Sequence, residues 1–172
     1  MRYLDLLAGW SRRVNLTGAR TPAERVEVLV VPALRALPLL GPGSVLDVGS
    51  GNGSPGLVLA VLEPERGVTL LEPRARRWAF LREAARAVGR GDVRILRDRH
   101  DGYAGPPAGN VMLRALRLPL PELGALVAPG GRLLTFGPPP APAAGWRQLA
   151  TPGAGPAAFV RAEAEDVPRG TE

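Results

Sequence analysis

Residues 45–56, which read Val-Leu-Asp-Val-Gly-Ser-Gly-Asn-Gly-Ser-Pro-Gly, constrain the fold of this chain more than any other stretch. The mostly apolar run Val45–Val48 is typical of a buried strand, and the apolar run Leu57–Leu62 is typical of a buried helix. The glycines between them let the backbone adopt positive φ and let a ligand approach the main chain, while the start of the helix offers unpaired N–H groups. The stretch therefore predicts a strand, a ligand-binding loop and a helix, in that order.

The residue that says most about the ligand is Asp47, which comes just before the first glycine. A carboxylate at the mouth of this loop repels phosphate, but it accepts hydrogen bonds from ribose hydroxyls or from an ammonium group. Together with the glycines that follow the strand directly, Gly49, Gly51 and Gly53, it favours a positively charged nucleoside. S-adenosylmethionine (SAM) is such a ligand, and it is the cofactor that we predict.

Two other interpretations of the loop remain open. Gly51, Gly53 and Gly56 also spell G-x-G-x-x-G, the fingerprint of dinucleotide binding, which would make the protein a nicotinamide-dependent oxidoreductase. Glu72 closes the next apolar run, and a carboxylate there suits the ribose hydroxyls of either ligand. The third possibility is a purely structural glycine turn.

Composition narrows the classes of function. The 172 residues contain no cysteine and one histidine, which excludes disulfides, thiolate zinc sites and a cysteine nucleophile, and disfavours a metal-activated water. The net charge is +6 and all 22 basic residues are arginine. A compositional bias explains the choice of arginine over lysine, but the positive sum favours a polyanionic partner such as nucleic acid. We find no signal peptide and no apolar run long enough to span a bilayer, so we expect a cytoplasmic protein. We also expect it to be a monomer.

The order of patterns along the chain predicts a doubly wound α/β fold, with a mostly parallel sheet behind two N-terminal helices. We expect a single domain with an N-terminal helical segment (1–40), a SAM-binding core (44–136) and a Pro/Ala/Gly-rich C-terminal segment (137–172). Expected helices cover residues 2–13, 74–88 and 118–127. Another helix, the second along the chain, is expected to start with a capping box at Thr21 and to end or kink at Pro32. Expected strands after the first two are 93–96, 111–113, 132–136 and an edge strand at 157–161.

The helix predicted at 74–88 carries many arginines. Its apolar face is formed by Trp78, Leu81, Ala85 and Val88, which leaves the arginines at 76, 82, 86 and 90 pointing mostly outward. A solvated face and an RNA-binding face explain this pattern equally well.

Three polar residues follow predicted strands. His100 and Asp101 come after the strand at 93–96, and Arg114 comes after the strand at 111–113. Ligands of open parallel sheets bind beyond the carboxyl ends of the strands, so we expect all three residues at the ligand crevice.

Several segments, taken in order, resemble the RsmG (GidB) family: Trp10 with Asn15-Leu16-Thr17, Leu46 to Gly56, Leu70-Leu71-Glu72, Arg76-Arg77-Trp78-Ala79-Phe80-Leu81 and Arg114-Ala115. This is a family of SAM-dependent methyltransferases that methylate N7 of a guanine in small-subunit (16S) ribosomal RNA. The resemblance implies a Rossmann-like fold, 16S rRNA or the small ribosomal subunit as partner, and SAM in the crevice. It also implies roles for Gly49 and Ser54 on the SAM loop, Glu72 at the ribose, His100 and Asp101 beside the adenine, and Arg114 at the methyl-donor end.

The chain departs from the family on the substrate side. The family's His-x-x-Asp-Ser signature is replaced by Leu29, Pro32 and Ala33, the serine before the motif arginine is Leu113, and the lysine after the fifth strand is Phe136. A SAM-binding but catalytically silent RNA-binding or regulatory relative is therefore an alternative to an active enzyme. Methylation at guanine N7 needs no general base, so we name no catalytic dyad and only one candidate, Arg114, to bind the SAM carboxylate or an RNA phosphate.

Overall fold

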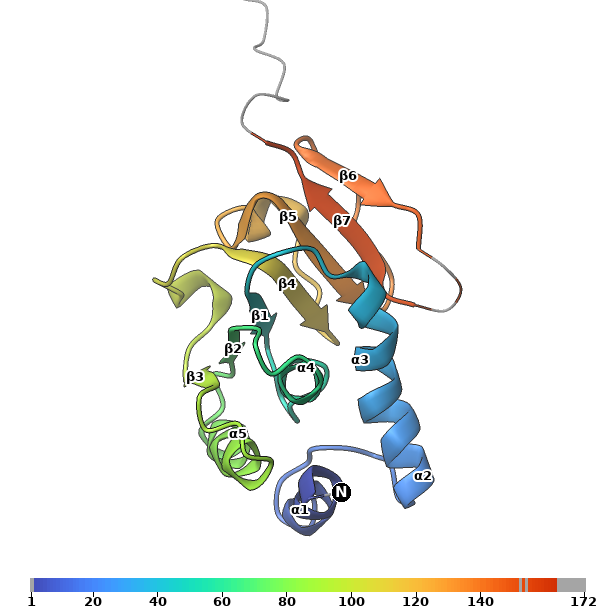
Figure 1. Ribbon diagram of the computed structural model, residues 1–172, viewed down its shortest axis with the longest axis vertical. Coiled ribbons are helices and arrows are strands. Elements are labelled where there is room, and N and C mark those ends of the chain that lie inside the picture. The colour runs from blue at the N-terminus through green and yellow to red at the C-terminus, as the bar shows by residue number, and fades with distance from the viewer. Residues whose placement is uncertain (1, 152, 154, 164–172) are drawn as a thin grey trace, which may run out of the picture.

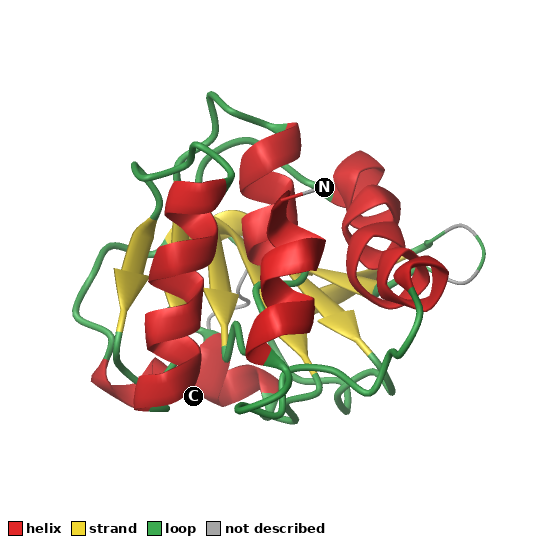
Figure 2. Ribbon diagram, turned by 90° about the horizontal axis from the view of Figure 1, so that it is seen from below, coloured by secondary structure: helices red, strands yellow, loops and turns green. Residues whose placement is uncertain are grey.

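A seven-stranded sheet with the strand order β3-β2-β1-β4-β5-β7-β6 runs through the middle of the molecule (Figures 1 and 2). The computed structural model describes residues 2–151, 153 and 155–163. The strands are β1 (Val45–Val48), β2 (Val68–Leu71), β3 (Arg94–Leu96), β4 (Ala108–Arg114), β5 (Val127–Phe136), β6 (Trp146–Leu149) and β7 (Ala157–Arg161). The first five are parallel, whereas β7 pairs antiparallel with both β5 and β6. The Rossmann-like fold predicted from the sequence is confirmed.

The helices lie on both faces of this sheet, with most of them on one face (Figure 2). The helical elements are α1 (Arg2–Trp10), α2 (Pro22–Arg25), the π-helix η1 (Val26–Val30), α3 (Val31–Ala36), the 3₁₀ turn η2 (Leu37–Leu39), α4 (Gly56–Leu62), α5 (Ala75–Ala87), the 3₁₀ turn η3 (His100–Gly102) and α6 (Leu120–Leu123). One apolar core joins α1, α3, α4 and α5 to the sheet, and a second joins α6 to the opposite face. Alternate residues of β4 supply the two cores, Met112 to the first and Val111 to the second.

The N-terminal helices follow the local sequence signals. The side chain of Thr21 accepts a hydrogen bond from the Glu24 N–H, and the Glu24 carboxylate accepts one from the Thr21 N–H, which is the predicted capping box. The helix does not end at Pro32, but its α geometry is interrupted just before it, where the chain passes through η1 and then continues as α3. A proline ring clashes with the carbonyl four residues earlier in a regular α-helix, and the wider π turn relieves that crowding.

Four expectations about the later elements were wrong. The helix expected at 118–127 is reduced to the four residues of α6, because it starts only after Pro119 and ends at Leu123, shortly before β5 begins at Val127. Strand β4 extends to both sides of the predicted 111–113, since Asn110 and its neighbours find partners on β1 and β5. β6 was not expected, and it makes β7 an inner strand instead of the predicted edge.

Arg90 is the fourth exception. It was expected to point outward from the helix at 74–88, but it is only 8% exposed. The helix has already ended, and Gly89 turns the chain at a φ of +77°. The Arg90 guanidinium then donates to both carboxylate oxygens of Asp92, at 2.8 and 2.7 Å.

Candidate functional site

Two adjoining cavities open at the carboxyl ends of β1, β2 and β4, where the sequence predicts the ligand. They have volumes of about 310 and 240 Å³ and share four lining residues, Gly49, Arg77, Arg114 and Ala115. The larger cavity is also lined by Glu72, Asp98 and His100, and the smaller one by Gly51, Asn52 and Ser54. Together they form one elongated crevice, a shape that suits a ligand with two distinct ends.

The glycine loop forms one wall of this crevice. Gly49 has a φ of +73° and lines both cavities, and Gly51 has a φ of +53° and lines the smaller one. These left-handed conformations are costly for residues with a Cβ, so glycine is required at both positions. Gly53 also has a positive φ, but it packs against Leu57 and Leu81 and lines neither cavity. Gly49 and Gly51 therefore shape the crevice, whereas Gly53 fits the loop onto the core.

Glu72 lies at the tip of β2, as predicted, and lines the larger cavity although it is only 3% exposed. Its Oε2 accepts a hydrogen bond from the Gly51 N–H at 2.9 Å, and its Oε1 accepts one from the Arg74 N–H at 2.8 Å. The carboxylate thus fixes the loop after β1 to the start of α5, and its remaining lone pairs are available to hydroxyl groups in the cavity.

Asp47 does not lie at the mouth of the loop, where the sequence interpretation placed it. It is 1% exposed, lines neither cavity, and its Oδ2 accepts a hydrogen bond from the Gly56 N–H at 3.1 Å. Burial raises the pKa of this carboxyl group to about 6, and the hydrogen bond from Gly56 opposes the shift. Asp47 holds the loop against the first turn of α4, beneath the crevice.

The raised pKa of Asp47 predicts a pH-dependent stability. The folded protein binds this proton more tightly than the unfolded chain, whose carboxyl has the ordinary pKa of 3.8. The stabilising contribution of this proton to the free energy of unfolding is therefore fully present below about pH 4. It amounts to roughly 3 kcal/mol and is lost as the pH rises to about 6. In urea unfolding between pH 4 and 7, the free energy of unfolding of Asp47→Asn is expected to rise by that amount relative to the wild type as pH increases.

Asp92→Asn is the matched control for this measurement. The Arg90 guanidinium lowers the pKa of the exposed Asp92 carboxyl below its ordinary 3.8, so this group releases its proton mostly below pH 4 in both the folded and the unfolded chain. The difference in unfolding free energy between this variant and the wild type is therefore expected to stay nearly constant between pH 4 and 7. Stability profiles of Asp47→Asn and wild type that run parallel across this range would contradict the burial argument.

Arg114 connects the crevice to the N-terminal helices. It lines both cavities, and its guanidinium donates to the Ser54 hydroxyl at 2.8 Å and to the Val28 carbonyl at 2.6 Å. The Ser54 hydroxyl in turn donates to the Leu29 carbonyl at 2.7 Å. Burial lowers the pKa of Arg114, with Tyr3 and Asp47 opposing the shift. Ala115 follows with a φ of +56°, a strained conformation for a residue other than glycine, located where the two cavities meet.

The two residues predicted after β3 occupy different positions. His100 lines the larger cavity, with its Nε2 at 3.5 Å from a carboxylate oxygen of Glu122. Asp101 instead lies at the surface in an ion pair with Arg99, and it lines neither cavity. Asp98 takes the place at the cavity that the sequence interpretation gave to Asp101. Its position directly after the strand at 94–96 is the signal that could have identified it.

The N-terminal segment closes the smaller cavity, which the sequence patterns did not indicate. The Asn52 side chain donates to the Leu16 carbonyl at 2.9 Å, and the Tyr3 hydroxyl donates to the Asn52 carbonyl at 2.7 Å. Arg77 donates to the Asn15 carbonyl at 3.0 Å from the other side. The glycine loop is therefore fixed to residues far from it in sequence.

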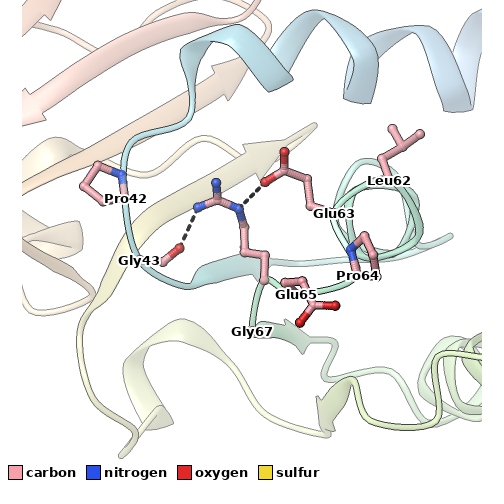
Figure 3. A pocket seen from close by; sticks show the side chains of 8 residues that line it. Pro42, Gly43, Leu62, Glu63, Pro64, Glu65 and Gly67 are labelled. Atoms are coloured by element: carbon pink, nitrogen blue, oxygen red, sulfur yellow. Dashed lines mark hydrogen bonds and ion pairs between the residues drawn. The ribbon is translucent and has the colours of Figure 1, made fainter.

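A larger hollow of about 600 Å³ lies at the opposite edge of the sheet, between the loops that precede β1 and β2 (Figure 3). There Arg66 pairs with the Glu63 carboxylate at 2.6 Å and donates to the carbonyls of Gly41 and Gly43 at 3.0 and 2.6 Å. These contacts join the two loops, so we interpret this hollow as a structural clamp at the amino ends of the strands.

Within the part of the chain that the structure describes, no group of three or more histidine or acidic side chains is placed to hold a metal ion. None of the described helices has the length and apolar character needed to cross a bilayer.

The mostly parallel sheet and the crevice at the carboxyl ends of its strands define a protein of the Rossmann-like class. Two solved structures share the fold. The RNA methyltransferase from Salinibacter ruber in complex with S-adenosyl-L-homocysteine is 17% identical with a TM-score of 0.54, and the match covers 91% of this chain and 99% of that one. TrmN from Thermus thermophilus is 24% identical with a TM-score of 0.54, over 91% of this chain and 52% of that one.

Residues 1–126 match the family model of GidB, the rRNA small subunit methyltransferase G, and the chain belongs to that family. The ribosomal RNA small subunit methyltransferase G of Xanthomonas axonopodis pv. citri (strain 306) is 36% identical over 138 residues, which are 80% of this chain and 63% of the relative. The corresponding protein of Halorhodospira halophila is 36% identical over 137 residues, which are 78% of this chain and 66% of the relative. The chain thus spans slightly less than two thirds of the length of these relatives.

Proposed function

We propose that this protein transfers a methyl group from SAM to N7 of a guanine in small-subunit (16S) ribosomal RNA, acting as a cytoplasmic monomer with a single domain. The observation that carries the proposal is a crevice, in a chain of the GidB family, where the glycine loop, Glu72 and Arg114 meet. Membership of a methyltransferase family disfavours the nicotinamide alternative. Calorimetry with SAM and with NAD separates the two ligands directly.

The two cavities fit the two ends of SAM. The larger one offers Glu72 for the ribose hydroxyls, with His100 and Asp98 beside the adenine in place of the predicted Asp101. The smaller one offers the Arg114 guanidinium, which suits the carboxylate of the methionine part. Asp47 and Gly53 contribute by holding the loop in shape from below.

The chemistry explains why the crevice needs no general base. SAM supplies a methyl group on a positively charged sulfur, and guanine N7 carries a lone pair and no proton at neutral pH. The chain therefore has only to align the two reactants and exclude water, and alignment of this kind contributes on the order of 7–11 kcal/mol to rate enhancements. Gly49, Glu72 and Arg114 hold one reactant in this proposal, and Ala115 lies at the junction where the second would approach.

A second candidate is a SAM-binding relative that does not turn over. Its basis is that the positions of the family's polar signature are apolar here: Leu29 and Ala33 are completely buried, and Leu113 is 2% exposed. Phe136, at the position of the family's lysine, packs against the core. These positions stabilise the fold of this chain, and they offer no polar group to an RNA substrate.

Incubation with methyl-labelled SAM and small ribosomal subunits or 16S rRNA from a strain without the endogenous enzyme tests the proposal. Nucleoside analysis is expected to find label in 7-methylguanosine. Glu72→Gln is expected to abolish labelling. The two Glu72 oxygens accept hydrogen bonds from two backbone N–H groups, and a glutamine would turn its NH₂ group, which is a donor, toward one of them. Glu65→Gln, an exposed residue at the opposite edge of the sheet (Figure 3), is the control that keeps activity. SAM binding without any labelled nucleoside would support the silent relative.

A further inference from the structure

A further cavity of about 490 Å³ lies between the end of α1 and the start of α5, two helices that pack side by side (Figure 1). Its lining includes Trp10 and three arginines, Arg12, Arg13 and Arg76. We call this cavity, with its three arginines, the arginine hollow. Arg76 is followed by Arg77, which lines the crevice, so a single turn of α5 separates the hollow from the candidate active site.

The arginines of the hollow lack the partners that other arginines of this chain have. Arg66, Arg90 and Arg99 each form an ion pair with a nearby carboxylate. For Arg12, Arg13 and Arg76, by contrast, no side-chain hydrogen bond or ion pair is found with any residue that the structure describes. The Glu83 carboxylate accepts the Trp10 indole N–H at 3.2 Å and forms no ion pair with these arginines. Three exposed cations that line one hollow therefore leave it a net positive charge, which attracts a polyanion.

The position of Arg76 also opposes stability. The first turn of α5 contains arginine and no acidic residue, although the N-terminus of a helix carries a partial positive charge. Cations at this end cost a few tenths of a kcal/mol each instead of stabilising the helix. An arginine that is unfavourable for its own helix is better explained by an external partner than by folding.

The two edges of the sheet carry charges of opposite sign, and the positive edge is the one next to the arginine hollow. The hollow at the amino ends of the strands is lined by Glu63 and Glu65, with Arg66 already paired (Figure 3). The edge that holds the crevice is lined by four arginines and two carboxylates, so its summed charge is positive, and the arginine hollow continues it. The arginines are 74, 77, 99 and 114, and the carboxylates belong to Glu72 and Asp98. A polyanion is therefore attracted to the crevice edge and repelled from the opposite edge.

We propose that the arginine hollow binds phosphates of the RNA strand next to the nucleotide that enters the crevice. This inference rests on the proposed function, because it assigns the docking surface of the same RNA substrate. Arginine suits the role, since its guanidinium forms two parallel hydrogen bonds with phosphate and stays charged at every physiological pH. The hollow reads no sequence in this arrangement, and it sets the position of the strand relative to the crevice.

The test is RNA binding without turnover, measured by fluorescence anisotropy with a 16S rRNA transcript and S-adenosylhomocysteine. The triple variant Arg12→Gln, Arg13→Gln, Arg76→Gln is expected to bind roughly 50-fold more weakly at 0.15 M salt, with the slope of log K against log salt reduced by about two, as loss of three single-strand phosphate contacts predicts. The matched control replaces three exposed arginines elsewhere, Arg86, Arg94 and Arg147, with glutamine.

The outcomes separate this inference from the proposed function. Unchanged RNA affinity in the triple variant, or an equal loss in the control, would overturn the inference whatever the activity. A selective loss of RNA affinity supports it even if no methyl group is transferred. If the enzyme is active, the KM for RNA is expected to rise while kcat and SAM affinity stay unchanged. The melting temperature of Arg76→Gln is expected to equal or exceed that of the wild type, so a lower one would assign the arginine a structural role instead.

Discussion

Gly56→Ala is expected to destabilise the protein by about 3 kcal/mol or more, the upper part of the range for an overpacked core. A Cβ at this position would lie 2.5 Å from the Asp47 Oδ2 and 2.6 Å from the Leu70 Cδ2. Neither neighbour can yield easily, because Leu70 is completely buried and Asp47 accepts the Gly56 N–H from the same side. The free energy of unfolding from urea titration measures the loss.

Gly9→Ala is the matched control for this substitution. A Cβ at Gly9 would meet nothing within 4 Å, and the residue lies inside α1. Alanine is favoured over glycine in a helix by about 1 kcal/mol, so this variant is expected to be as stable as the wild type or more stable. Equal stabilities of Gly56→Ala and Gly9→Ala would show that α4 is free to move away from β1, contrary to the packing seen here.

The effect of Gly56 explains how the crevice depends on residues that never face it. β1 and α4 approach closely only because no side chain separates them at Gly56, and Asp47 fixes that approach from below. The loop between them carries Gly49 and Gly51 at the crevice wall. Gly56→Ala is therefore expected to weaken SAM binding through the position of the loop, without loss of any ligand contact.

The parts of this structure that could be predicted from sequence are those set by local signals. The glycine loop, the capping box at Thr21 and the irregular helix geometry next to Pro32 each depend on residues a few positions apart, and all three are present. Glu72 was placed correctly because the tip of a parallel strand points to one edge of the sheet. The pattern of local residues and the rules of parallel sheets together fix most of the crevice.

The parts that could not be predicted depend on contacts between distant segments. Burial of Asp47 requires α4 to lie directly on β1, and nothing in the carboxylate itself indicates that depth. β6 was missed because a Pro/Ala/Gly-rich composition specifies little by itself, and the strand forms by pairing with β7. Arg114 and Val28 are 86 positions apart, so no local pattern could reveal that the crevice arginine is tied to the π-helix.

That contact also gives Pro32 a role that its position in a helix conceals. In a continuous α-helix, the N–H of residue 32 would donate to the carbonyl of Val28, but proline has no N–H. Pro32 cannot make this bond, and the Arg114 guanidinium donates to the Val28 carbonyl at 2.6 Å. Pro32 thus removes one backbone donor at the point where the crevice arginine is anchored.

Arg114→Lys is accordingly expected to lower SAM affinity by roughly 10- to 100-fold, as loss of a charged hydrogen bond predicts. A lysine ammonium is a single point and cannot span the Ser54 hydroxyl and the Val28 carbonyl as the guanidinium does. Isothermal calorimetry measures the affinity. An unchanged value would show that Arg114 does not touch the ligand and that its geometry does not matter to the site.

The anchor itself is tested by a double-mutant cycle of Arg114→Ala and Pro32→Ala, with the free energy of unfolding as the readout. Alanine at position 32 restores an N–H that can donate to the Val28 carbonyl, so removing Arg114 is expected to cost about 1 kcal/mol less in that background. Pro38→Ala is the matched control, because Pro38 is an exposed proline in η2. The effects of Arg114→Ala and Pro32→Ala could instead be additive within the error seen for the Pro38 pair. That result would mean that the N–H of residue 32 does not replace the Arg114 guanidinium at the Val28 carbonyl, and that Arg114 is positioned by Ser54 alone.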